Sequence, residues 1–504
     1  MEKDKCSRTE ADANTSASDI LRTIPRPQYP IRIFFGKPTP FCLETQRRKM
    51  IWKHPRHRPF HPKGKWLEEL NIDDIRLVLG RILILLGHEA GERFSVEFLS
   101  SGSFNRVYTV QTPSKVYAFR VPLPIDPYFK TEADVATTEL VRHFTGIPVP
   151  KIYAYESSAD NALGLEWILM DKITAGKMLA DSWTSLDLDQ KTQMTRTIAR
   201  WMSQLSKIRA KKIGSIYMRY SGDDKLDFFI GRSVNTLFTY DERLMYDVPR
   251  GPFSSLKEYY ATYLAVAKRD VDRMDGFASV FSMSHQTLIS DWPRLRNWTE
   301  HPELRKQYAE QETEQGIELK HLNRGISALQ QALPALCAKI GDTRLSTRLS
   351  HLDLSERNIL VDQHGTPVVI LDWENIELLP RTFLSTPAFV SISKNRRLTS
   401  YFNHWNERIA CIRDSEKLDE IAKWYHSREE YERRKHERPV LRRVYYEELK
   451  KLECPLVRVG WDHRPSFDRE LCMRVWDSTT GAEGHIEWIN SHLSDGAHIQ
   501  DKVD

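Results

Sequence analysis

The sequence has few cysteines, and nothing in their spacing suggests a covalent or metal-bound framework. Six cysteines are spread over 504 residues, and none of them forms a C-x-x-C pair. A small secreted domain would have many more disulfides for its length, and a zinc ribbon would have paired cysteines. We therefore expect reduced thiols and a fold that depends on its hydrophobic core.

Long hydrophobic runs are also missing. The most apolar segment, residues 75–86, is shorter than the roughly 20 residues that span a bilayer, and it contains Arg76 and Arg81. The beginning of the sequence, MEKDKCSRTEADANTS, lacks the apolar stretch of a secretory signal. We therefore expect a cytoplasmic protein without a membrane partner.

Charge of either sign is not in large excess. The chain has 74 Lys and Arg against 69 Asp and Glu, which gives a net charge of +5. Its isoelectric point of about 8.7 lies below the value of about 9 that is typical of nucleic-acid-binding domains. Residues 46–66 form a basic run without an acidic side chain, which is typical of a solvated segment, a nuclear localisation signal or a nucleic-acid-binding arm. Outside this run we expect no nucleic-acid partner.

The length and the sequence pattern indicate two folded parts between two tails, since 504 residues exceed what one core usually organises. Residues 1–66 are polar, proline-rich and basic, and we expect a poorly ordered arm. Residues 67–87 have apolar residues at helical spacing, and short β-rich runs with a helix over about 130–144 fill the rest of residues 67–175. Helical periodicity dominates residues 176–475. Residues 476–504 look like a polar tail. The expected fold class is α+β, with a small β-rich part followed by a larger, mainly helical one.

Two features within the helical part have a specific interpretation. The runs NILVD (358–362) and VVILDW (368–373) are separated by QHGTP, which predicts a β-hairpin. The charge-dense segment 428–453 predicts a helix whose charged face is solvated.

The clearest chemical motif is an H-x-D-x-x-x-x-N string that opens this hairpin. It supplies His351, Asp353 and Asn358, and Asp372 comes directly after the second apolar run. Phosphoryl transfer needs a carboxylate that accepts the proton of the attacking hydroxyl and oxygen ligands that hold Mg²⁺ at the phosphates. The catalytic loop of protein kinases has the same spacing of Asp and Asn, followed by a metal-binding Asp. These side chains therefore supply the atoms that phosphoryl transfer requires.

A candidate phosphate-binding turn lies between two of the early β-rich runs. It reads Ser-Ser-Gly-Ser-Phe over residues 100–104. Gly102 allows a close approach of the backbone, and the small serines leave amide groups free for phosphate oxygens. A single glycine in a hairpin is more often ordinary turn chemistry, so this turn is weak evidence without the hairpin motif.

The next strand offers a cation for the phosphates. Alternation in VYAFRV places Ala118 and Arg120 on one face. The acidic partner of Arg120 should come from the following helix, where Asp134 is the best candidate and Glu132 or Glu139 is the alternative. An ordinary surface ion pair is the other interpretation.

Several phrases of the sequence together resemble the aminoglycoside phosphotransferase family, and in particular its fungal branch. The match runs with gaps from about Leu99 to Pro380. The resemblance implies a two-lobed, protein-kinase-like fold, ATP with Mg²⁺, and transfer of the γ-phosphate to a hydroxyl of a small molecule. The phrases are GSFNRVYTV, DVATTELVRHFTGIPVPKIYAYE, WILMDKITAGK, KKIGSIYMRY, RGPFSSLKEYY, HLDLSERNIL and VVILDWE.

The resemblance also implies a role for each matching residue. Asp353 would be the catalytic base, Asn358 and Asp372 would hold Mg²⁺, and His351 would brace the catalytic loop. The residues implied to bind ATP are Ser101, Gly102, Ser103 and Phe104 over the phosphates, Ala118 beneath the base, Arg120 with Asp134 as the cation and its partner, and Met170, Asp171 and Ile173 at the connector between the lobes, where the last two would offer backbone hydrogen bonds to adenine.

The sequence departs from the family pattern at three positions. Arg120 and Asp134 stand where most kinases have Lys and Glu, and the forked guanidinium changes the geometry at the phosphates. Leu352 stands where the relatives usually have Gly.

Because of these departures, the alternative function is that of a catalytically weak or inactive kinase-fold protein that binds a nucleotide or a partner. A third interpretation makes the basic arm the working part and the kinase fold its scaffold. Glu374 and Glu377 either favour a cationic acceptor or are solvated.

Overall fold

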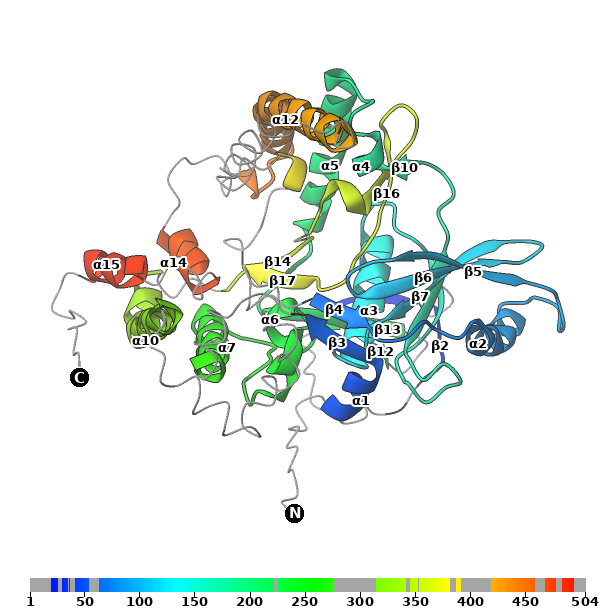
Figure 1. The fold of residues 1–504 in the computed structure, drawn as a ribbon, viewed down its shortest axis with the longest axis horizontal. Helices are drawn as coiled ribbons and strands as arrows, with labels where there is room; N and C mark the ends of the chain where they lie inside the picture. The colour runs from blue at the N-terminus through cyan, green and yellow to red at the C-terminus, as the bar shows by residue number, and fades with distance from the viewer. Residues whose placement is uncertain are drawn as a thin grey trace, which may run out of the picture.

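A computed structural model gives the fold of the chain (Figure 1). It describes residues 20–25, 30–34, 36, 41–53, 63–221, 225–275, 314–340, 345–351, 353–380, 387–390, 418–457, 467–476 and 483–493. A smaller N-terminal lobe contains one large sheet, and a larger C-terminal lobe contains a second sheet and most of the helices, so the expected α+β, two-lobed fold is confirmed. No helix in these ranges is long and apolar enough to cross a membrane.

The sheet of the N-terminal lobe has its strands in the order β2-β8-β9-β7-β6-β5. All neighbours are antiparallel except β2 and β8, which are parallel. The predicted early strands are confirmed, but β2 and β8 were not predicted. The strands are β2 (Ile31–Arg32), β5 (Ser95–Ser101), β6 (Asn105–Gln111), β7 (Val116–Pro122), β8 (Ile152–Glu156) and β9 (Trp167–Asp171).

Two helices pack with this sheet. Helix α2 (Ile72–Leu85) begins after Asn71, whose side chain accepts the N–H of Asp73 at 2.9 Å and so caps the helix. Its apolar face is part of the core of the N-terminal lobe. Helix α3 (Phe129–Phe144) follows β7, and its apolar residues share a core with the C-terminal lobe. Because α3 lies between the lobes, its position affects both.

The C-terminal lobe contains a second sheet that the sequence analysis missed. Its strands have the order β1-β13-β12-β17-β14-β11. We expected helices here, apart from the hairpin, but β13 pairs along its whole length with residues 216–221 of β12, and the two strands bury residues such as Ile216, Met218 and Phe228. The strands are β1 (Ile20–Pro25), β11 (Arg209–Ala210), β12 (Gly214–Ser221), β13 (Lys225–Ile230), β14 (Thr347–Ser350) and β17 (Glu377–Pro380).

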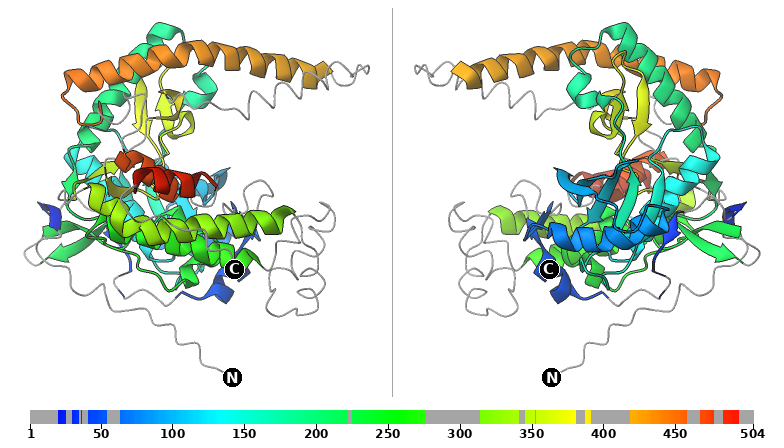
Figure 2. Two further views of the ribbon diagram at one scale, coloured as in Figure 1. Left: turned by 90° about the vertical axis from the view of Figure 1, so that its left-hand side faces the viewer. Right: turned by 90° about the vertical axis from the view of Figure 1, so that its right-hand side faces the viewer.

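The C-terminal part of the chain forms helices that pack on this lobe, although its composition is rich in charged residues. Helix α12 (Leu418–Lys451), the long orange helix at the top of both views of Figure 2, packs across α5 (Leu188–Leu205), and it buries Leu441, Tyr445 and Leu449. The predicted helix is confirmed, and charged side chains such as Lys435, Arg443 and Glu447 are exposed, but the helix also has a buried apolar face that was not predicted. The other helices are α4 (Leu179–Ser182), α6 (Thr236–Thr239), α7 (Leu256–Asp275), α10 (Glu314–Ile340), α14 (Phe467–Trp476) and α15 (Glu483–His492), with short 3-10 helices at Asp241–Met245, Glu356–Asn358 and Ala388–Val390.

The C-terminal tail is also partly folded. Helix α15 packs against α10, and its Trp488 and Ile489 are buried in the same core as α7 and α10. The expectation of a polar tail over residues 476–504 is therefore wrong for residues 483–493.

The expected N-terminal arm is folded wherever the structure describes it. Strand β1 pairs with β13, and helix α1 (Leu43–Lys49) leads into a hairpin of β3 (Met50–Lys53) and β4 (Lys63–Trp66). Met50, Trp52 and Trp66 of this hairpin are buried in the core of the N-terminal lobe. The prediction of a poorly ordered arm is therefore wrong here, because the buried Met50 and Trp52 alternate with Ile51 and Lys53 and give this part of the basic run a buried face.

A third, small sheet holds the predicted late hairpin. Strand β15 (Ile359–Val361) pairs with β16 (Pro367–Ile370) on one side and with β10 (Lys177–Met178) on the other. The hairpin prediction is confirmed, and the sheet places the H-x-D-x-x-x-x-N string against the remainder of the C-terminal lobe.

Candidate functional site

Hydrogen bonds join the three polar residues of the hairpin motif. The side-chain Nδ2 of Asn358 donates to the backbone oxygen of Asp353 at 2.8 Å. The backbone oxygen of Asn358 accepts the N–H of Leu371 at 2.8 Å. Asn358 therefore connects the loop of Asp353 to the segment that carries Asp372.

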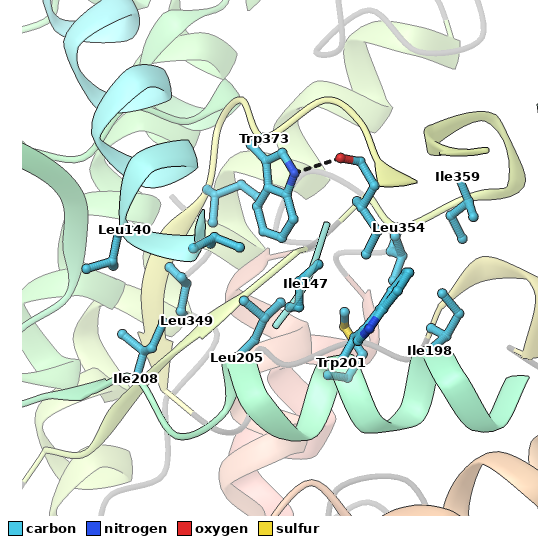
Figure 3. Close-up of a cluster of buried hydrophobic side chains, with 14 of the residues drawn as sticks. Leu140, Ile147, Ile198, Trp201, Leu205, Ile208, Leu349, Leu354, Ile359 and Trp373 are labelled. Atoms are coloured by element: carbon cyan, nitrogen blue, oxygen red, sulfur yellow. Dashed lines mark hydrogen bonds between the residues drawn. The ribbon is translucent and has the colours of Figure 1, made fainter. Parts of the chain in front are cut away.

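Buried apolar neighbours fix this arrangement. An apolar residue directly follows each of the three polar ones. These apolar residues are Leu354, Ile359 and Trp373, and their exposed fractions are at most 3%. Figure 3 shows all three in one cluster. The indole Nε1 of Trp373 also donates to the backbone oxygen of Ile370 at 3.0 Å. The hydrophobic core thus holds the backbone on which the polar side chains are mounted.

His351 lies under the same loop. Its Nε2 is 3.4 Å from the backbone oxygen of Leu371, and its ring meets that of Trp373 edge to face. Burial lowers the pKa of His351 to about 4, so the ring is neutral at pH 7. These contacts are those expected of a bracing residue. Leu352 lies outside the described residues.

The carboxyl groups of the site have raised pKa values. Burial, together with the nearby carboxylate of Glu374, raises the pKa of Asp372 to about 8. Asp353 is exposed, but the protein around its carboxyl removes enough water to raise its pKa above the ordinary value. A cation beside Asp372 would offset this cost.

The donor set fits Mg²⁺. Since Nδ2 of Asn358 is used within the loop, its Oδ1 remains as a ligand atom, and Asp372 offers a carboxylate. No group of three or more His, Cys, Asp or Glu among the described residues could hold a metal ion. Two protein ligands with phosphates and water are what Mg²⁺ commonly uses, whereas a metal that needs a full protein cage would not fit.

The predicted cation and its partner are brought together. Arg120 Nη2 lies 3.0 Å from the carboxylate of Asp134, and both side chains are almost fully buried. The two alternative partners are used elsewhere: Glu132 binds Arg32, and Glu139 binds Arg142.

The sequence analysis missed a second cation, Lys130. Its Nζ donates to Asp134 at 2.8 Å and to Glu374 at 2.6 Å. Burial would lower the pKa of Lys130, but the carboxylates of Asp134 and Glu374 outweigh burial and raise it, so the group is charged. The spacing of four residues between Lys130 and Asp134 on one helix could have indicated the pair.

The two acidic residues after Asp372 are buried. Glu374 accepts from Lys130 and from Nδ2 of Asn105, the latter at 2.9 Å. Glu377 is 1% exposed and accepts from Nδ2 of Asn235 at 2.7 Å. The interpretation that Glu374 and Glu377 are solvated is therefore wrong. Both carboxylates bind side chains of the protein itself.

The candidate phosphate-binding turn connects β5 to β6. The N–H of Gly102 donates to the backbone oxygen of Asn105 at 2.9 Å, and residues 101–103 are exposed. A Cβ added to Gly102 would meet only that oxygen, at 3.9 Å, so packing within the protein does not require a glycine here. The ring of Phe104 lies 6.4 Å from that of Tyr240. The bond between Asn105 and Glu374 joins the turn to the Asp372 segment.

The residues expected at adenine lie on two neighbouring strands. Ala118 of β7 is buried opposite Met170 of β9. The N–H of Asp171 donates to the backbone oxygen of Lys151 at 2.8 Å, so a backbone hydrogen bond from Asp171 to adenine would have to use its carbonyl oxygen. Ile173 follows β9 and is half-buried.

The chain matches a family of phosphotransferase enzymes over residues 95–383. It is 26% identical over 301 residues to a subtelomeric hrmA-associated cluster protein of Aspergillus fumigatus, and the alignment covers 56% of this chain and 58% of the relative. It is 21% identical over 322 residues to altered inheritance of mitochondria protein 9 of Lachancea thermotolerans, and this alignment covers 58% of this chain and 49% of the relative. The chain thus spans about half the length of the curated relatives it matches.

A solved structure of a putative fructosamine-3-kinase from Haemophilus somnus aligns with 79% of this chain and 96% of its own, at 12% identity and a TM-score of 0.35. The family match covers more than half of the chain and contains every candidate site residue from Ser101 to Asp372. The chain therefore belongs to this phosphotransferase enzyme family.

Proposed function

We propose that the protein transfers the γ-phosphate of ATP to a hydroxyl group of a small molecule and uses Mg²⁺ to do so. The observation that supports this most strongly is the position of Asn358, which hydrogen-bonds to the loop of Asp353 and to the strand end before Asp372. The proposed proton acceptor, Asp353, and the proposed metal ligands, Asn358 and Asp372, thus flank one hairpin, and phosphoryl transfer needs these three groups.

In this proposal each residue has a separate task. Asp353 accepts the proton of the attacking hydroxyl, and its raised pKa brings it closer to the working pH. Asn358 and Asp372 hold Mg²⁺, which neutralises charge on the phosphates. Arg120 and Lys130 add positive charge, and the turn at Gly102 supplies backbone N–H groups.

Binding of a nucleotide without turnover is the second candidate. It is favoured by the two ion pairs of Lys130, which meets the protein's own carboxylates Asp134 and Glu374. If these pairs persist when nucleotide binds, less positive charge is available to the transferring phosphate.

Labelled phosphate separates the two candidates. The purified full chain, Mg²⁺ and γ-labelled ATP are incubated with a metabolite extract, and labelled products are detected. We expect a labelled small molecule with the wild-type protein, and a rate lower by about 10² to 10⁴-fold with Asp353→Asn, since a general base contributes about that much. Asp160→Asn is the matched control, because Asp160 is exposed and lies outside the hairpin. Nucleotide binding without any labelled product would support the second candidate instead.

A further inference from the structure

The N-terminal segment 20–34 precedes the part of the chain that matches the family, which begins at residue 95. Its two strands belong to different lobes. Strand β1 is added to the edge of the C-terminal sheet beside β13, and β2 is added to the edge of the N-terminal sheet beside β8. The segment therefore connects the outer edges of both sheets.

The same segment contacts both ends of helix α3. The guanidinium of Arg22 lies 5.8 Å from the ring centre of Phe144, the last residue of the helix. Near the other end, Arg32 Nη2 lies 2.7 Å from Oε1 of Glu132. The helix rises about 18 Å between these two contacts. The described parts of the segment therefore touch α3 near both of its ends.

The contact at Glu132 is a buried ion pair. Glu132 is 2% exposed, and its carboxylate accepts from Arg32, from Ser157 Oγ at 2.5 Å and from Tyr155 Oη at 3.3 Å. A buried carboxylate is costly unless charge and hydrogen bonds compensate it. Arg32 supplies the compensating charge, so the first turn of α3 depends on β2.

The opposite face of the same turn carries the site. Lys130 and Asp134 flank Glu132 at a spacing of two residues, which places them on the other side of the helix. There they meet Glu374 and Arg120. Since a helix turn moves as one body, a displacement at Glu132 also displaces Lys130 and Asp134.

We propose that Arg32 is a positioning residue for the reaction proposed above: it holds the first turn of α3 to β2, so that Lys130 and Asp134 meet their partners at the phosphate site. It touches neither nucleotide nor acceptor. The inference rests on the proposed function for its purpose, but the structural step, from Arg32 to α3, is independent of catalysis.

Hydrogen exchange of the full chain tests that step. In Arg32→Ala we expect the amides of α3 to exchange at least about tenfold faster, which corresponds to about 1.4 kcal/mol, while α10, which lies far along the chain in another core, exchanges as in the wild type. Arg32→Lys should restore most of the protection because it keeps the charge. Arg48→Ala is the matched control, since Arg48 also precedes the part of the chain that matches the family but lies on α1 and pairs with Glu44 on the surface, where the side chains are 73% and 75% exposed.

A second variant covers the case in which Arg32→Ala does not fold. Glu132→Gln leaves no buried carboxylate without a partner, and its amide oxygen can still accept a hydrogen bond from Arg32, so the chain should fold. The variant removes the ion pair and should also speed exchange in α3. Unchanged α3 exchange in Glu132→Gln, or equal acceleration of α3 and α10, would overturn the inference.

Binding of Mg²⁺ with a non-hydrolysable ATP analogue separates this inference from the proposed function. We expect the dissociation constant to rise about tenfold in Arg32→Ala and to stay unchanged in Arg48→Ala. If the wild-type protein does not bind the analogue, the proposed function fails, and the α3 exchange still decides the positioning step. If the wild type and Arg32→Ala bind equally well, the positioning inference fails and the proposed function stands.

Discussion

Lys130 of α3 and Glu374, two residues after Asp372, form an ion pair of 2.6 Å between the two lobes. Their side chains are 3% and 8% exposed. Lys130 also binds Asp134, and Glu374 also accepts from Asn105, which follows the glycine turn. The ion pair therefore connects helix α3 with this turn and with the segment that carries Asp372. A pair with so little solvent around it affects both stability and the geometry of the site.

Removal of one partner of this pair should destabilise the protein. We expect Lys130→Met to lower the free energy of unfolding by about 3 to 5 kcal/mol, because it leaves the carboxylate of Glu374 buried without its nearest cation. Chemical denaturation measures the change. Lys268→Met is the control: Lys268 pairs with Asp272 near the surface, where such pairs contribute about 0 to 1 kcal/mol. Equal losses in the two variants would contradict the interpretation of the buried pair.

The double variant Lys130→Met with Glu374→Gln gives a second check. It removes both charges, so we expect it to be more stable than Lys130→Met alone. A double variant that is no more stable than Lys130→Met would show that the loss comes from packing and not from the unpaired charge.

Gly102→Ala should weaken nucleotide binding without a cost in stability. The added Cβ has room in the free protein, so the unfolding free energy should change by less than about 0.5 kcal/mol. The methyl group would stand where the phosphates are expected to approach the backbone. Gly365→Ala is the control for a glycine that the fold requires. Gly365 has a φ of +80° and packs on Leu186, so this variant should have a lower free energy of unfolding than the wild type. Undiminished nucleotide affinity in Gly102→Ala would argue against a phosphate at this turn.

Stability should depend on pH through Glu377. Burial raises the pKa of Glu377 to about 7, from 4.5 for an ordinary glutamate. Between these values the folded protein holds a proton that the unfolded chain has released, so this group lowers stability as the pH rises through that window. Glu377→Gln removes the effect, and we expect it to gain up to about 3 kcal/mol on the wild type between pH 4.5 and pH 7.5.

Denaturation at both pH values measures this gain. Glu97→Gln, at an exposed position on β5, should show no pH-dependent difference from the wild type. A constant difference between Glu377→Gln and the wild type at all pH values would contradict the raised pKa.

Local patterns were enough to predict the parts of the site that are close in the sequence. Asp353, Asn358 and Asp372 flank one hairpin, and Arg120 and Asp134 lie on a strand and the helix that follows it, so spacing and alternation were enough to predict which of these residues lie close together. The partner of Lys130 is 244 residues away, and no local pattern could reveal it. General statistics also misled us about Glu374, since glutamates are mostly exposed.

The folded N-terminal segment was missed for a related reason. Its prolines and basic residues suggested disorder, but strands at a sheet edge tolerate both. Strand β1 finds its partner in β13, about two hundred residues later in the chain. The buried alternation of Met50 and Trp52 was visible in the sequence and was outweighed by the surrounding charge.

The central claim is that Asp372 and Asn358 hold Mg²⁺ beneath the phosphates of ATP. Calorimetric titration of the full chain with a non-hydrolysable ATP analogue, with and without Mg²⁺, tests it most directly. We predict that Mg²⁺ strengthens binding to the wild-type protein and that Asp372→Asn abolishes this strengthening, while Asp160→Asn keeps it. Equal binding with and without Mg²⁺, or an undiminished effect of Mg²⁺ in Asp372→Asn, would contradict the account.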